Sequence, residues 1–244
     1  MHNEMKEITD IHCHILPYVD DGALRVQESD ELLKAQYAQG VRTICATPHL
    51  RKGMFETPDE TIVLQFERLK MRAAEICPDV SLFLSREYHC DRLFRDRLVS
   101  HQVMPLGNGS YLLSEFSYRH SEEQIHDYIR LIQDSGFKPL IAHAERYPAI
   151  CESTEQVEKL IDMGAMIQMN VSSILGREGR KQASWCKKLL KAHLVHVVAS
   201  DAHDPEERPV ELGLCAEYLE RKFGAELAEE LLCINPFKIL NIDL

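Results

Sequence analysis

Short apolar runs that end in a histidine or a carboxylate restrict the fold of this chain more than any other feature. Runs of this length are typical of buried parallel strands. Six of them end at residues that can bind a metal ion: His12, His14, His49, Glu87, Glu115, His143, Asp201 and His203. In a barrel of parallel strands all the C-terminal ends open onto one face. These side chains are therefore predicted to converge at that face.

Seven strands are expected along the chain, near residues 7–12, 42–47, 81–87, 111–116, 138–143, 165–170 and 195–200. Helical patterns fill the gaps between them. This alternation, without a linker rich in proline or serine and without a repeat of fixed period, favours one α/β barrel over two domains. We therefore expect residues 1–244 to form a single barrel domain.

Several helix ends can be placed from capping residues. Residues 57–60 (Thr-Pro-Asp-Glu) predict a helix start with the threonine as its N-cap and the proline at its first position. Ser121 and Ser153 each begin a capping box, a serine followed three residues later by glutamine. Gly224 is expected to split residues 208–233 into two helices.

The composition disfavours several classes of protein. The formal net charge of -11 argues against a surface for duplex nucleic acid, because phosphate backbones attract clustered lysine and arginine. No stretch approaches the ~18 consecutive apolar residues of a membrane span, and the polar N-terminus lacks a hydrophobic signal core. The eight cysteines are scattered without a CxxC pair, so they are expected to be reduced and partly buried, as in a cytoplasmic protein. We expect no nucleic-acid partner and no membrane insertion, and the sequence predicts no oligomeric state.

The spacing of the candidate ligands favours a site with more than one metal ion. His12 and His14 are two residues apart on an expected strand, which places both rings on one face. Histidine and carboxylate ligands without thiolate favour Mn, Fe, Zn or Mg, and a carboxylate can bridge two ions about 3.5–4 Å apart. Residues 20–22 (Asp-Asp-Gly) fit either a turn or a metal ligand, and the residues alone do not decide between them. The remaining histidines are interpreted as structural or solvent-facing: His2, His89, His101, His120, His126, His193 and His196.

Five motifs occur in the order in which a known family carries them. They are DIHCHILP at residues 10–17, DDG at 20–22, ATPH at 46–49, IAHAERY at 141–147 and ASDAH at 199–203. Together they resemble the polymerase-and-histidinol-phosphatase (PHP) superfamily. Within it the chain is most similar to bacterial manganese-dependent protein tyrosine phosphatases of capsule and exopolysaccharide operons, the CpsB type. The similarity runs over nearly the whole chain.

The resemblance implies a distorted (β/α)7 TIM-like barrel, the PHP fold, with three metal ions at its C-terminal face. Manganese is expected, with Fe, Zn or Mg as substitutes. By position, one ion would be held by His12, His14, Glu87 and Asp201. A second would share Glu87 and add Glu115 and His143. The third would take Asp21, His49 and His203. Departures from the family pattern at Leu50, Ser85-Arg86, Ala144 and Val171-Ser172 bear on loop shape and substrate preference and remove no expected ligand.

The resemblance also implies a reaction. We expect a protein-tyrosine phosphatase that acts on the tyrosine-rich tail of a membrane-bound bacterial tyrosine kinase controlling capsular or exopolysaccharide synthesis. In this hypothesis a metal-bridging hydroxide attacks phosphorus in line, while Arg146 and Arg208 bind the nonbridging oxygens. Tyrosinate is a fairly good leaving group, with a pKa of about 10, so a dedicated general acid is not required. His203 could still supply the proton.

Other functions were weighed against this one. Histidinol phosphate or another small phosphomonoester could be the substrate of the same metals, and the sequence does not exclude it. An amidohydrolase is disfavoured by the paired arginines, and a non-catalytic metal-binding regulatory module by the completeness of the ligand set. Cys45 and Arg51 fit the C-x5-R pattern of cysteine phosphatases. Such a loop wraps phosphate with backbone N–H groups, and Pro48 has none, so we reject that mechanism.

Overall fold

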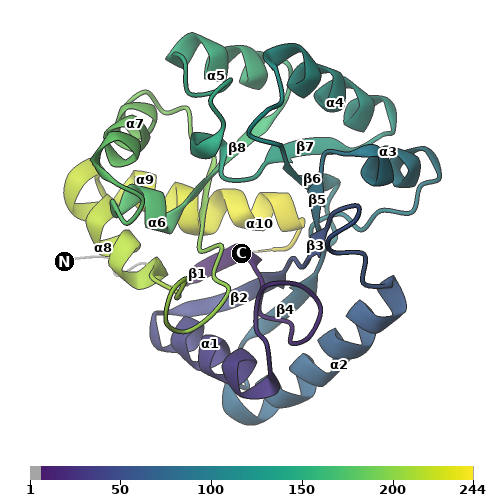
Figure 1. The fold of residues 1–244 in the computed structure, drawn as a ribbon. Coiled ribbons are helices and arrows are strands. Elements are labelled where there is room, and N and C mark those ends of the chain that lie inside the picture. The colour runs from purple at the N-terminus through teal and green to yellow at the C-terminus, as the bar shows by residue number, and fades with distance from the viewer. Residues whose placement is uncertain (1–6, 244) are drawn as a thin grey trace.

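Parallel strands curl around the centre of the molecule, and helices cover their outer face (Figure 1). The computed structural model describes residues 7–243. One parallel sheet has the strand order β1 (Ile8–Cys13), β2 (Val41–Ala46) and β4 (Ser81–Leu84). The other has the order β3 (His49–Leu50), β5 (Glu87–His89), β6 (Tyr111–Glu115), β7 (Lys138–Ile141), β8 (Met166–Asn170) and β9 (Val197–Ala199). The expected α/β fold with a curled parallel sheet is confirmed. Over residues 7–243, however, the strands form two sheets of three and six strands and not one continuous seven-stranded barrel sheet.

Each of the seven expected strands is found, but one of them is interrupted. The stretch at residues 81–87 consists of β4 followed by β5, and β2 is followed by β3, a two-residue strand that the sequence did not predict. The Ser85 N–H donates to the carbonyl of Ala46 (2.9 Å) and the Glu87 N–H to that of Pro48 (3.2 Å), so the two chain segments stay hydrogen-bonded across the interruption. Because Pro48 has no N–H, the regular ladder cannot continue through it.

The helices alternate with the strands along the chain and lie around the sheet (Figure 1). The α-helices are α1 (Val26–Ala38), α2 (Asp59–Ile76), α3 (Arg92–Val99), α4 (Glu122–Asp134), α5 (Thr154–Asp162), α6 (Val171–Ile174), α7 (Arg180–Lys191), α8 (Leu212–Phe223), α9 (Ala225–Glu229) and α10 (Asn235–Leu240). A 3-10 turn, η1 (Ala144–Arg146), follows β7, and a π-helical segment, η2 (Glu230–Ile234), joins α9 to α10.

The capping residues show which local sequence signals were sufficient to predict where a helix begins. The Ser121 capping box is confirmed, with both of its hydrogen bonds formed to Gln124. Ser153 accepts from the Gln156 N–H (3.4 Å), but the Gln156 side chain donates to a carboxylate on α4 instead of completing the box. The prediction for Thr57 was wrong, because its hydroxyl donates to the Val19 carbonyl and α2 begins at Asp59. Tertiary contact therefore overrides the local cap. Gly224 separates α8 from α9, as expected.

Alternation along the strands creates two apolar layers. Leu113, Leu140 and Val197 belong to an interior cluster, while the residues next to them pack under the helices. The interior cluster is completed by Ile239 and Leu240 of α10, the yellow helix in the middle of Figure 1. This packing fills the interior of the curled sheet.

The remaining composition-based expectations concern membranes and thiols. Over residues 7–243, no helix is long and apolar enough to cross a membrane. All eight cysteines are free thiols, and all but the half-buried Cys151 are buried. They act as small apolar core residues, as predicted.

Candidate metal centre

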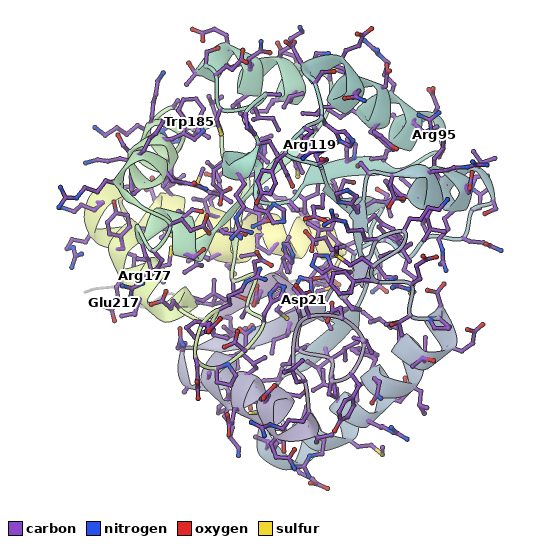
Figure 2. The ribbon with its side chains drawn as sticks, in the orientation of Figure 1. Asp21, Arg95, Arg119, Arg177, Trp185 and Glu217 are labelled. Carbon is purple, nitrogen blue, oxygen red and sulfur yellow. The ribbon has the colours of Figure 1, made fainter. Side chains whose placement is uncertain are left out.

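Six strands and the turn after β1 bring all nine predicted ligand residues to one region of the molecule. Eight of them form three groups whose nitrogen and oxygen atoms lie within 4.8 Å of one another: His12, His14, Glu87 and Asp201; His14, Asp21, His49 and His203; His49, Glu87 and Glu115. The ninth, His143, contacts Glu87 directly, with 2.8 Å between its Nε2 and the Glu87 Oε1. Asp21 lies near the middle of the view in Figure 2.

The first group is the most enclosed. The His12 Nε2 lies 3.3 Å from the His14 Nε2, 3.2 Å from the Glu87 Oε2 and 3.3 Å from the Asp201 Oδ1. The His14 Nε2 lies 3.2 Å from the same Glu87 oxygen and 3.5 Å from the same Asp201 oxygen. All four side chains are almost completely buried. Four donor atoms therefore surround one point at the end of β1.

The outer ring nitrogens of His12 and His14 reveal why this arrangement fits a cation. The His12 Nδ1 lies 3.1 Å from the Gln168 Oε1, which also accepts the backbone N–H of His143. The His14 Nδ1 lies 2.7 Å from a carboxylate oxygen of Asp20. With a proton on each Nδ1, both Nε2 atoms present lone pairs to each other and to two carboxylates. Lone pairs and carboxylates this close repel one another unless a metal ion lies among them. A carboxylate or amide oxygen on the outer ring nitrogen is also the usual partner of a metal-binding histidine.

The other two groups also contain a buried atom that lacks a partner. Within residues 7–243, the His203 Nε2 forms no hydrogen bond, while the His49 Nδ1 lies 2.9 Å from the Glu87 Oε2. Buried polar atoms are nearly always satisfied, so the His203 Nε2 needs an explanation. The His49 Nε2 and the His203 Nε2 lie 3.5 and 3.6 Å from the Asp21 Oδ1. The residues present thus fit a bound cation here as well.

The second expected ligand set differs in one respect from the observed geometry. His49, rather than His143, lies with Glu87 and Glu115 at a spacing suitable for an ion. His143 instead makes a hydrogen-bond-length contact to Glu87 and a second one, from its Nδ1, to the Tyr147 hydroxyl (2.9 Å). The His143 ring is thus held at both nitrogens. The Tyr147 hydroxyl is itself fixed in place, because it also accepts the Phe116 N–H (3.1 Å).

The backbone is strained at two of the expected ligands. His143 has φ 32° and Asp201 has φ 51°, the left-handed region that residues other than glycine rarely adopt. Both residues follow the end of a strand, β7 and β9 respectively. Strain of this kind persists where the surrounding structure enforces it, and it clusters at functional sites.

The buried groups shift one another's pKa values. Burial lowers the pKa of His12, His14 and His49, but the adjacent carboxylates outweigh it and raise those pKa values. Burial raises the pKa of Glu87, but the adjacent His12 and His49 outweigh it and hold that pKa well below the usual range. Burial lowers the pKa of His203 to about 2, and the neighbouring His14 adds to the effect. A neutral His203 donates from Nδ1 to the Asp201 carbonyl (2.9 Å), which leaves a lone pair on Nε2. His203 is therefore arranged to donate a lone pair, which disfavours its expected second role as a proton donor.

Residues 20–22 serve as both a turn and a part of the site. The Asp20 side chain accepts the Gly22 N–H (3.0 Å), which forms a tight Asx turn. A Cβ at Gly22 would lie 2.1 Å from the His14 carbonyl oxygen, so only glycine allows the chain to fold back this closely. Asp20 then contacts the His14 ring from the buried side, and Asp21 faces the cluster with its side chain 47% exposed.

The two predicted phosphate-binding arginines meet at one carboxylate. The Arg146 Nη1 and the Arg208 Nη2 lie 3.1 and 2.9 Å from the Asp201 Oδ2. Arg146 also donates to both carboxylate oxygens of Glu178. Both guanidinium groups line a cavity of about 390 Å³ at the mouth of the site, whose full lining is Asp21, His49, Arg51, Met54, Phe55, Glu115, Tyr118, His143, Arg146, Glu178, Asp201 and Arg208.

Several residues of the site were missed at the level of sequence. His89 was interpreted as structural or solvent-facing, yet its buried ring contacts Glu115, with 2.8 Å between Nδ1 and Oε2. Its position two residues after Glu87 on a strand was the signal that could have found it. Arg51 at the mouth and the buried Arg86 behind His49 carried no such signal. His2 lies outside the described residues.

The thiol alternative is disfavoured by the surroundings of Cys45. The side chain is completely buried within β2, and burial raises the pKa of its thiol far above the usual range. A thiol that cannot ionise is a poor nucleophile.

Comparison with known proteins gives matches over most of the chain. A family model described as "Capsular polysaccharide synthesis, CpsB/CapC" matches residues 8–241. The chain is 38% identical over 236 residues to the tyrosine-protein phosphatase CpsB of Streptococcus pneumoniae, which covers 95% of this chain and 97% of that protein. Among solved structures it matches, with a TM-score of 0.88, 31% identity and coverage of 97% and 96%, a chain from the crystal structures of Bacillus subtilis YwqE and Streptococcus pneumoniae CpsB, described as metal-dependent tyrosine phosphatases. A Listeria monocytogenes lactonase matches with a TM-score of 0.64 at 12% identity, covering 99% of this chain and 96% of the lactonase, which shows a shared fold alone.

Proposed function

The chain belongs to the CpsB/CapC family of capsular polysaccharide synthesis, and we propose that it is a metal-dependent phosphatase that hydrolyses phosphotyrosine in a protein substrate. The observation that carries this proposal is the cluster of lone pairs and carboxylates around the ends of β1, β5 and β9, with two arginines beside it. Slow phosphomonoester hydrolysis demands strong stabilisation of negative charge, and this region concentrates the groups able to provide it.

We assign three ions to the site, with manganese as the preferred metal and Fe, Zn or Mg as substitutes. Their ligand sets are His12, His14, Glu87 and Asp201; Glu87 and Glu115 with His143, beside which His49 also lies at a suitable spacing; and Asp21, His49 and His203. Support comes from the crowding of three histidine nitrogens around the Glu87 Oε2, from the His203 Nε2, which forms no hydrogen bond within residues 7–243, and from the oxygen and nitrogen character of the donors. When bound, divalent ions of this kind act as Lewis acids and lower the pKa of water.

The protein's own residues would bind and orient the substrate. Arg146 and Arg208 present planar guanidinium groups at the cavity mouth, suited to the nonbridging oxygens of a phosphate. Met54 and Tyr118, 60% and 64% exposed, offer apolar surface beside them for the phenyl ring of the substrate. Tyr147 is buried against His143 and positions that histidine rather than stacking on the substrate.

The biological setting follows from the family. We propose that the substrate is the phosphotyrosine tail of a bacterial tyrosine kinase that controls capsular or exopolysaccharide synthesis, and that the protein acts in the cytoplasm.

We also propose that residues 1–244 form one domain, a distorted (β/α)7 barrel. Two hydrogen bonds between the end of β1 and the segment after β9 support closure: Asp201 N–H to His12 carbonyl and His14 N–H to Ala202 carbonyl, both 2.8 Å.

Metal removal and reconstitution test the proposal. Protein stripped with EDTA should lose activity on a phosphotyrosine peptide and regain it with Mn²⁺ more than with Mg²⁺, since the ions supply the electrophilic groups of the reaction. Histidinol phosphate, tested in parallel, should be a poorer substrate by kcat/KM because its aliphatic alcohol is a worse leaving group than tyrosinate, whose pKa is about 10. A Cys45→Ser control should retain activity.

Two results would contradict this function. Activity that survives exhaustive metal removal would point to a mechanism without metals. A preference for histidinol phosphate would assign the site to small phosphomonoesters instead.

A further inference from the structure

A second concave surface adjoins the cavity above the metal centre. This groove has a volume of about 1080 Å³. It shares Arg146 and Glu178 with the mouth of the site and extends along α7, the helix that carries Trp185 in Figure 2. A molecule held at Arg146 could therefore continue directly into the groove.

The charge of the groove is opposite to that of the protein. Four lysines of α7 line it, namely Lys181, Lys187, Lys188 and Lys191, in a chain whose net charge is -11. All four are exposed, and none forms an ion pair with any residue between positions 7 and 243. Among the carboxylates of the lining, Glu178 is paired with Arg146 and Glu145 is buried, which leaves Glu152 as the exposed carboxylate without an ion pair among residues 7–243. The groove thus has an uncompensated positive charge.

Helical spacing aligns these groups along one side of α7. Lys181, Lys188 and Lys191 are separated by seven and three residues, which places them on the same face. The half-buried Trp185 lies between them on that face, and the Lys188 Nζ is 5.4 Å from the centroid of its ring. An indole flanked by lysines offers a flat apolar surface together with cations, a combination suited to an extended peptide that carries carboxylates.

We propose that this groove binds the segment of the substrate protein next to the phosphotyrosine, and that it selects segments rich in glutamate or aspartate. The proposal rests on the phosphotyrosine phosphatase function given above and names the sequence context that this function prefers. A peptide is favoured over a flat anionic surface because the lysines line a concave surface that is continuous with the site through Arg146.

The test uses Mn²⁺-loaded full-length protein and four synthetic peptides of equal length. Three contain one phosphotyrosine, with three glutamates on its N-terminal side, three on its C-terminal side, or glutamines at all those positions. The fourth replaces one flanking glutamine of the neutral peptide with a second phosphotyrosine. One glutamate peptide should exceed the glutamine peptide in kcat/KM by about fivefold at 50 mM salt, mostly through KM, as expected for a few exposed ion pairs. The preference should shrink at 500 mM salt because of screening.

Matched charge changes separate the groove from the overall charge of the protein. Lys181→Glu/Lys188→Glu should abolish the preference for glutamate, and Lys181→Arg/Lys188→Arg should keep it. Lys34→Glu/Lys222→Glu makes the same change at exposed lysines outside the groove and should also keep it. The substituted side chains are exposed, so the fold should tolerate them.

Several results would overturn the proposal. Equal kcat/KM for the single-phosphotyrosine peptides, or loss of the preference in the Lys34→Glu/Lys222→Glu control, would remove the groove from substrate selection and leave the phosphatase function intact. A preference for the second phosphotyrosine without one for glutamate would replace carboxylates by phosphate as the ligand.

Lysine-dependent binding to vesicles of phosphatidylglycerol, without any peptide preference, would reassign the surface to membranes. Failure to hydrolyse every phosphotyrosine peptide, alongside hydrolysis of histidinol phosphate, would remove the proposed function itself.

Discussion

Asp20 shows how a residue outside the ligand set can control the site. Its buried carboxylate binds the His14 ring (2.7 Å) and accepts the backbone N–H of His49 (2.9 Å). Burial raises the pKa of Asp20, but the neighbouring His14 and His49 lower it well below the usual range, so the group is charged. A charged partner keeps the proton of His14 on Nδ1 and makes the lone pair on its Nε2 a stronger metal ligand. Sequence indicated that an aspartate of the pair could be a ligand, but not that the other holds a histidine.

Replacement of this carboxylate by its amide should weaken metal binding. In Asp20→Asn we expect the Mn²⁺ concentration that gives half-maximal activity to rise by about 10- to 100-fold, the usual effect of losing such a partner. Titration of the metal-free protein with Mn²⁺ measures the change, and circular dichroism checks the fold. Asp79→Asn, at a half-exposed aspartate that pairs with Arg42, is the control and should titrate like the unmodified protein. An unaltered Mn²⁺ dependence in Asp20→Asn would show that the His14 tautomer does not depend on Asp20.

Among the elements, the junction of β4 and β5 connects the metal centre to the helices. Arg86 is completely buried there, and its guanidinium donates to the carbonyls of His49 and Thr57 and to the carboxylate of Asp59. Asp59 at the start of α2 also binds Arg97 of α3. One ion-pair network thus connects the strand end that carries His49 to two helices. Local sequence predicted this strand but not its interruption, because no pattern marks a buried arginine.

The Asp59 network should stabilise the fold in a pH-dependent manner. Although partial burial raises the pKa of Asp59, its hydrogen bonds with Arg97 and Arg86 outweigh it and lower that pKa. Its contribution is therefore present above the unfolded pKa, about 3.9, and disappears as the pH falls through the lower folded value. Asp59→Asn should lower the urea midpoint at pH 7 and approach the unmodified protein near pH 3.

Glu60→Gln supplies the matched control, since Glu60 is an exposed acid in the same helical turn. It should change the midpoint much less at pH 7. Equal effects of the two substitutions would assign the stabilisation to the helix dipole rather than to the arginines.

At the scale of the whole molecule, periodic patterns predicted more than isolated residues did. The seven strands and the position of eight ligands at strand ends followed from apolar runs, because burial of a parallel strand imposes a continuous pattern. Strand β3 was missed since two residues form no pattern, and the role of α10 was missed since a six-residue helix has little periodicity. The basic groove was also missed, because lysines on a helix are usually only solvated.

The spread of ligands over the strand ends makes the global stability dependent on metal. The ligand residues lie in or just after β1, β3, β5, β6, β7 and β9, so bound cations connect most of the sheet. Mn²⁺ at 100 times its dissociation constant should add about 2.7 kcal/mol per independent site. That corresponds to a rise in Tm of about 5–10 °C for a chain of this size. Thermal unfolding with EDTA and with Mn²⁺ measures the shift, which His12→Ala should reduce. An identical Tm under both conditions would contradict a cation-centred site.

The position of α10 has a consequence for how the chain matures. Ile239 and Leu240 fill the space between strands formed more than 200 residues earlier in the case of β1. During synthesis, the apolar side chains that line the strands therefore lack these packing partners until α10 has left the ribosome. Until then the nascent chain exposes apolar surface, which chaperones can bind and through which the chain can aggregate. The complete core can thus form only after α10 has been synthesised, even though most strands and helices are available well before.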